Sequence, residues 1–141
     1  MVLAGKVFRL TENLPLPEIA LRLENYRTEE TFEEEEYKFT LITEILHVTH
    51  QENTIRGLYS HDYVTRIFHR GKSIPVPRTI EATFCFAQQD DRVLLAVLEK
   101  KRIANNIANQ LSQLIYGKLG GIVEARIPPE NLKEFHLKNP E

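Results

Sequence analysis

The chain has 141 residues, of which 42% are hydrophobic and 27% are charged, and its formal net charge at pH 7 is -2. A chain of this length can bury about two-thirds of its unfolded surface, enough for one globular domain. The small net charge excludes a global attraction to nucleic acid or acidic lipid, and the single cysteine excludes an intramolecular disulfide. We therefore expect a soluble cytoplasmic or otherwise intracellular protein without membrane contact, folded as a single domain over residues 1–141 or forming one domain of a larger protein or complex.

The first third of the chain predicts a strand, a helix and a loop. Residues 6–11 contain a short apolar pattern typical of a strand. Pro15 and Pro17 fit the first turn of a helix that continues to about Tyr26, because the first amides of a helix lack partners. Residues 27–36 contain six glutamates, whose mutual repulsion predicts a solvated loop.

Two long strands are predicted next, over residues 37–49 and 54–69, because apolar side chains alternate along both. A turn at 50–53 joins them, and a break or bulge is expected at Ser60-His61-Asp62. Pairing Thr49 with Thr54 divides the apolar side chains between two faces, Phe39, Leu41, Ile45, Leu58 and Val64 on one and Ile42, Leu46, Val48, Ile55 and Tyr59 on the other.

The segment 70–78 is interpreted as a loop, since Pro75 and Pro77 cannot donate ladder hydrogen bonds. Strands are predicted at 79–87 and 122–127, and a buried central strand at 92–98. Between the last two, residues 101–116 have the apolar spacing of a helix that buries Ile103, Ile107, Leu111 and Ile115 against the sheet.

Gly117 is the expected end of that helix. A short terminal helix is predicted from Pro128. The whole order predicts an α+β fold, namely a mostly antiparallel β-sheet with helices packed on one face.

The residues that commonly carry catalysis or bind metal do not fall in productive patterns. His47 and His50, three apart in a strand, point to opposite faces, and no metal-ligand spacing is present. Ser60, His61 and Asp62 are sequence neighbours and cannot converge as a triad. Cys85 lies between two phenylalanines, where an inert buried thiol is expected. We therefore expect no enzymatic activity, no metal and no cofactor.

Basic side chains and aromatic rings are interleaved in residues 54–78. Cations contact phosphates while rings stack on unpaired bases, so this hairpin and its loop are a candidate nucleic-acid surface. The start of the later helix adds a second basic cluster. The candidate nucleic-acid-binding residues are Arg56, Arg66, Arg70, Lys72, Arg78, Lys100, Lys101 and Arg102.

One flank of the 101–116 helix is a stripe of amides, Asn105, Asn106, Asn109, Gln110 and Gln113. Glu and Lys would serve a bare solvent face better, so the stripe indicates contact with an uncharged surface. Asn105, Asn109 and Gln113 are the candidate partner-binding residues.

Two hypotheses follow. The leading one is a non-enzymatic protein-interaction or assembly module, homo-oligomeric or with a different protein partner, because two helices can cover only one face of the long strands. The alternative is a nucleic-acid-binding protein that uses the basic 54–78 hairpin and loop.

Overall fold

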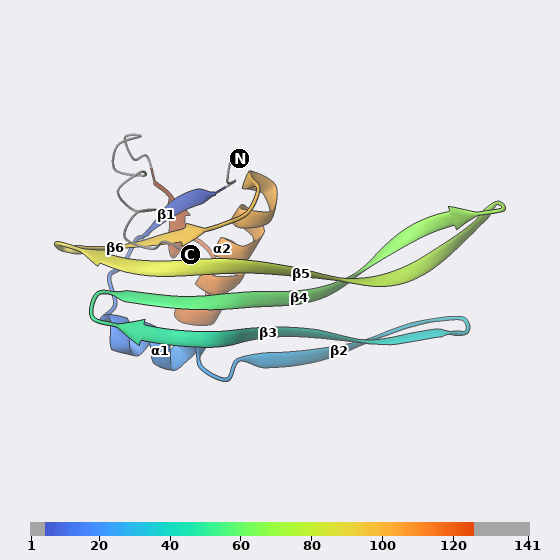
Figure 1. The fold of residues 1–141 in the computed structure, drawn as a ribbon, viewed down its shortest axis with the longest axis horizontal. Helices are drawn as coiled ribbons and strands as arrows, with labels where there is room; N and C mark the ends of the chain where they lie inside the picture. The colour runs from blue at the N-terminus through green and yellow to red at the C-terminus, as the bar shows by residue number, and fades with distance from the viewer. Residues whose placement is uncertain (1–4, 126–141) are drawn as a thin grey trace.

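The computed structural model describes residues 5–125, which form a seven-stranded antiparallel sheet and two helices (Figure 1). Across the sheet the strand order is β2-β3-β4-β5-β6-β1-β7. The mostly antiparallel α+β architecture is thus confirmed. The strands are β1 (Lys6–Leu10), β2 (Arg27–Glu34), β3 (Tyr37–Gln51), β4 (Thr54–His69), β5 (Lys72–Gln89), β6 (Arg92–Val97) and β7 (Ile122–Glu124), and the helices are α1 (Leu16–Leu23) and α2 (Lys101–Tyr116).

The main core joins both helices to one set of alternating strand residues. On β6 this set comprises Val93, Leu95 and Val97, while Leu94 and Ala96 belong to a smaller second cluster. Successive side chains of a strand point to opposite faces, so β6 is buried on both, as its continuous apolar run predicted.

Helix α2 has the predicted bounds and buried face. Ile107, Leu111 and Ile115 are almost fully buried, and Ile103 packs partly buried at the edge of the same cluster. Gly117 ends the helix in the left-handed region, with φ of 75°, and its amide donates to the carbonyl of Gln113 at 2.8 Å. A left-handed residue at this position is the usual place for glycine because it has no Cβ.

The glutamate-rich segment 27–36 is not a loop, contrary to the prediction. Its residues up to Glu34 form β2, an outer strand that pairs with β3 from Arg27 to Glu34. The glutamates are mostly exposed, and Phe32 instead stacks on Phe39 of β3 with ring centroids 5.8 Å apart. An outer strand can carry such charges because they remain in water, where they also discourage pairing with other chains.

The predicted loop at 70–78 was also wrong, since β5 already begins at Lys72. Arg70 and Gly71 form a two-residue turn, both with positive φ as a tight hairpin requires. Pro75 and Pro77 lie within β5, which β6 joins only from Phe84 onward among the described residues. A proline is tolerated on such a free edge, where its missing amide would not face a ladder.

The predicted pairing of β3 with β4 was wrong by two residues next to the turn and by one residue beyond the bulge in β3. Gln51 pairs with Thr54 across a two-residue turn, and the register then shifts between Leu46 and Thr49. At this bulge His47 has φ of 56°. The irregularity therefore lies in β3, whereas β4 runs unbroken through the segment where a break was expected.

Beyond the bulge, the one-residue error exchanges the predicted faces of β4 relative to β3, because a slip of one residue turns each side chain to the other face. Ile45 lies opposite Tyr59, and both belong to the main core. Leu46 lies opposite Leu58, and both are half-buried. The two apolar sets derived from the sequence are consequently mixed.

The C-terminal prediction can be followed only in part. Strand β7 ends at Glu124, and the helix expected from Pro128 lies outside the described residues. Neither helix within 5–125 has the length and apolar character needed to cross a membrane.

Candidate interaction site

Strands β2 to β5 continue well past the helices and separate into two hairpins (Figure 1). The ladder between β3 and β4 ends at the pair Thr43–His61. Beyond it, β2 pairs with β3 over residues 29–42 and β4 pairs with β5 over residues 62–79. We call these hairpins the acidic arm (29–42) and the basic arm (62–79).

Asp62 occupies the fork between the arms. One carboxylate oxygen accepts the amide of Ile42 at 2.9 Å, and the other accepts the hydroxyl of Thr79 at 2.6 Å. These two hydrogen bonds, that from Thr79 first, lower the pKa of Asp62. The side chain of Asp62 thus links the two arms by a hydrogen bond at the point where the backbone ladder between β3 and β4 ends.

A second link joins the arms farther out. The guanidinium of Arg66 donates to both carboxylate oxygens of Glu34, one of them at 3.0 Å. This hydrogen bonding lowers the pKa of Glu34. Both side chains are exposed to solvent, so the pair fixes geometry more than it stabilises the fold.

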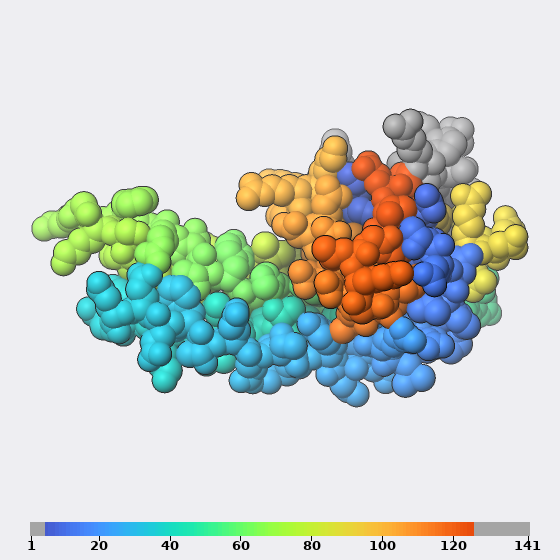
Figure 2. Space-filling model, turned by 180° about the vertical axis from the view of Figure 1, so that it is seen from behind, coloured from blue at the N-terminus to red at the C-terminus, as the bar shows by residue number. Residues whose placement is uncertain are grey.

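The arms carry opposite charges. The acidic arm has six glutamates and one lysine, and the basic arm has four cations and one aspartate. At the outer end of the basic arm, Ile67 and Phe68 are 44% and 80% exposed. Figure 2 shows both arms extending beyond the helices when the molecule is seen from behind.

The candidate nucleic-acid-binding residues are brought together only in part. Arg66, Arg70, Lys72 and Arg78 all lie on the basic arm. Arg56 lies in the body of the sheet opposite Cys85. Residues 100–102 stand at the start of α2, away from the tip of the arm (Figure 1).

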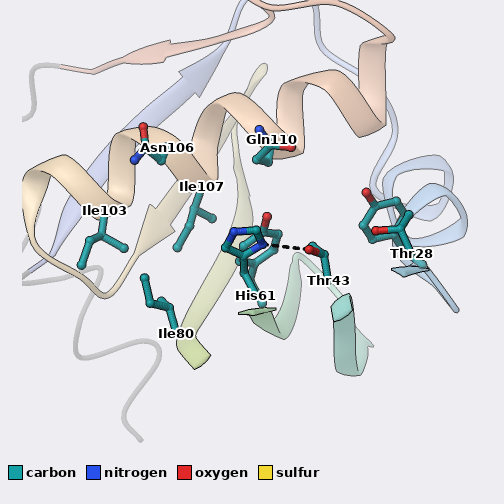
Figure 3. Close-up of a pocket in the computed structure, with 10 residues that line it drawn as sticks. Thr28, Thr43, His61, Ile80, Ile103, Asn106, Ile107 and Gln110 are labelled. Atoms are coloured by element: carbon teal, nitrogen blue, oxygen red, sulfur yellow. Dashed lines mark hydrogen bonds between the residues drawn. The ribbon is translucent and has the colours of Figure 1, made fainter. Parts of the chain in front are cut away.

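The amide stripe divides between two environments. Asn109 and Gln113 are exposed and Asn105 is half-buried. Asn106 and Gln110, one helical turn apart, line a pocket that the sequence did not predict (Figure 3). The spacing of these two amides places both on one flank of α2, and this pattern in the sequence could have indicated the pocket.

The pocket lies between α2 and the sheet and has a volume of about 350 Å³. The imidazole Nδ1 of His61 lies 2.8 Å from the hydroxyl of Thr43, and the ring of Tyr59 stacks on that of His61. Burial, with a smaller effect of Tyr26, raises the pKa of Tyr59 to about 12, which keeps its hydroxyl neutral. The lining residues are Tyr26, Thr28, Thr43, Tyr59, His61, Ile80, Ile103, Asn106, Ile107 and Gln110.

Cys85 has the environment expected from its phenylalanine neighbours. It is 6% exposed, and burial raises its thiol pKa to about 11. A thiol with this pKa is a poor nucleophile at neutral pH. Within residues 5–125, no three His, Cys, Asp or Glu side chains gather in a way that could hold a metal ion.

Comparisons with protein-family models, curated proteins and solved structures found no match to this chain.

Proposed function

We propose that this chain is a non-enzymatic assembly module that pairs with a second copy of itself through its two arms. The observation that carries the proposal is the opposite charge of two hairpins that lie side by side. Within the chain, Arg66 and Glu34 form an ion pair between the arms, and the other exposed charges of the arms can find opposite charges on a second molecule.

Two-fold symmetry makes the arrangement self-complementary. In a two-fold symmetric dimer, if the basic arm of one chain contacts the acidic arm of the other, then the acidic arm of the first chain also contacts the basic arm of the second. An axis that passes between the arms exchanges their positions. Each basic arm then faces the other chain's acidic arm, so both contacts are attractive.

Apolar groups on the arms provide the second part of the contact. Phe68 is exposed at the end of the basic arm. Burial of its ring against a second chain would be strongly favourable. The acidic arm carries a half-buried group of three rings, since Phe39 lies next to both Phe32 and Tyr37. We assign Phe68 of one chain to this ring group of the other.

The way in which the two helices cover the sheet supports association through the arms. Residues of α1 and α2 share one core cluster, so we place both helices on the same face of the sheet. Within residues 5–125, the two helices cover the body of the sheet and leave the arms without a helix layer (Figure 2). The arms are therefore the part of the fold for which a second chain supplies the missing contacts.

The second candidate function is nucleic-acid binding through the basic arm. Its support is the combination of Arg66, Arg70, Lys72 and Arg78 with the exposed ring of Phe68. Cations next to a stacking ring suit a single strand. The acidic arm stands beside these groups and would repel phosphates, which places this function second.

A charge-reversal experiment tests self-association. We expect wild-type protein at tens of micromolar to sediment with twice the chain mass. Glu33→Lys with Glu36→Lys changes the net charge of the acidic arm from -5 to -1, and Arg70→Glu with Lys72→Glu changes that of the basic arm from +3 to -1. Each double variant should bind itself at least tenfold more weakly. An equimolar mixture of the two variants should associate more tightly than either alone, because the mixed pair keeps one contact between unaltered arms.

The matched control reverses two cations outside the arms, Arg92→Glu with Lys101→Glu, and should associate like wild type. A wild-type chain that stays monomeric at all concentrations would overturn the proposal. In that case, binding of a fluorescent single-stranded oligonucleotide that is weakened by the Arg70 and Lys72 reversals would establish the second candidate.

A further inference from the structure

We infer that the pocket between α2 and the sheet binds a neutral heteroaromatic ring with a donor–acceptor edge, the chemistry of a nucleobase. This inference concerns the body of the fold and does not depend on the arms. The pocket has a volume of about 350 Å³, at the lower end of the range for small-molecule sites. This volume fits a single base with its sugar.

Apolar walls define the shape of the ligand. Ile103 and Ile107 project from α2 and Ile80 rises from the sheet below them (Figure 3). Aliphatic side chains on opposite sides of a gap favour a flat apolar face between them. A ring can fill this space, whereas a branched or strongly hydrated group would leave it partly empty.

Polar groups at the other end of the pocket define the edge of the ligand. The His61 Nδ1 contact with Thr43 leaves Nε2 as a donor or an acceptor according to the tautomer. The amide of Gln110, on the helix above, offers an N–H and a carbonyl side by side. Carboxamides pair in this way with base edges that carry one donor and one acceptor.

The charge of the lining selects against ionic ligands. No Asp, Glu, Lys or Arg is among the ten lining residues, and the raised pKa of Tyr59 keeps its hydroxyl protonated. A carboxylate or ammonium group would lose its hydration there without gaining a charged partner. The base itself, which is neutral at pH 7, carries no such penalty.

The base could come from a free nucleoside or from a single-stranded nucleic acid. We would titrate ¹⁵N-labelled protein separately with uridine, adenosine and single-stranded tetranucleotides of uracil and of adenine, and follow amide shifts of Thr43, Ile80 and Ile103. Binding by a nucleoside but not by its tetranucleotide identifies the free compound. Tighter binding by the tetranucleotide identifies a strand.

The variant Gln110→Leu keeps the size of the side chain and removes its hydrogen bonds. Because Gln110 is exposed, the fold should persist, and the affinity for the bound probe should fall about tenfold. Gln113→Leu, on the same helix but outside the pocket, is the matched control and should bind like wild type. The inference is overturned if no probe shifts the pocket amides at millimolar concentration, or if Gln110→Leu binds as well as the control.

Discussion

At the scale of single residues, Gly57 shows how closely the core is packed. It lies in the middle of β4 directly opposite Phe84 of β5. A Cβ at this position would stand 2.6 Å from the ring carbon Cζ of Phe84, which is itself fully buried. Glycine within a strand usually marks such an approach of a neighbouring group.

We predict that Gly57→Ala lowers the free energy of unfolding by about 1–3 kcal/mol, because the ring cannot move without straining its neighbours. Urea denaturation measures the loss. In a Phe84→Leu background the same change should cost less, since the smaller side chain leaves room for the methyl group. An equal cost in both backgrounds would assign the effect to the backbone and not to the ring.

The environment of some residues could be predicted without the fold. The burial of Cys85, Ile107 and Leu111 follows from neighbours a few positions away, which the helical or strand period reveals. The contact of Gly57 with Phe84 depends on which residues face each other across two strands. That register is set by tertiary pairing and is absent from local pattern.

At the scale of elements, both described helices and most strands were predicted, whereas β2 and the first part of β5 were not. Both missed segments contain residues that usually interrupt sheets, glutamates in β2 and prolines in β5. A strand edge that faces water tolerates such residues. The rule for a central strand therefore predicted loops at 27–36 and 70–78, where the structure has β2 and the first part of β5.

The bulge at His47 had a similar effect on the candidate site. One extra residue in β3 reversed the side-chain directions that the sequence predicted for its pairing with β4. Thr43 and His61 are consequently neighbours on the pocket side, where they form a hydrogen bond. Because the sequence did not predict this bulge, it could not predict which residues line the pocket.

The fork at Asp62 gives a prediction at this scale. Asp62→Ala removes the acceptor for two donors and should lower the free energy of unfolding at pH 7 by about 1–2 kcal/mol. The folded-state pKa is lowered, so this stabilisation is complete above the unfolded value of about 3.9 and is lost as pH falls through the folded value. The difference between wild type and variant should therefore shrink below about pH 4.

Urea denaturation of both proteins at several pH values measures that difference. Glu30→Ala removes an exposed carboxylate on the acidic arm and serves as the control, with little effect expected at any pH. A deficit for Asp62→Ala that is the same at pH 7 and pH 3 would show that the charge of the carboxylate is not involved.

At the scale of the whole molecule, the charge separation seen in the sequence becomes a separation in space. Residues 1–52 hold eleven of the acidic side chains, and the structure gathers the densest of them on one arm. The basic arm stands next to it and carries the exposed ring of Phe68. The electrostatic and apolar contributions to the proposed self-association can therefore be separated, because salt screens only the electrostatic one.

We predict that Phe68→Ser raises the dissociation constant of the paired chains at least fivefold at both low and high salt, since an exposed aromatic at a contact commonly contributes more than 1 kcal/mol. Wild type should itself weaken as salt increases. Sedimentation equilibrium at two salt concentrations measures both effects. Leu119→Ser, which alters another exposed apolar side chain outside the arms, is the control, and an equal loss in that variant would contradict the assignment.

The prolines of β5 also bear on how far the proposed association could proceed. A bare strand edge acts as a template on which further chains add without limit, as in fibrils. Pro75 and Pro77 lie on the free edge of β5, and the outer strand at the other side of the sheet is β2, dense with glutamates. Growth by edge-to-edge addition is thus obstructed at both places, and we expect the proposed pair of chains to remain dispersed at concentrations at which an open-ended polymer would precipitate.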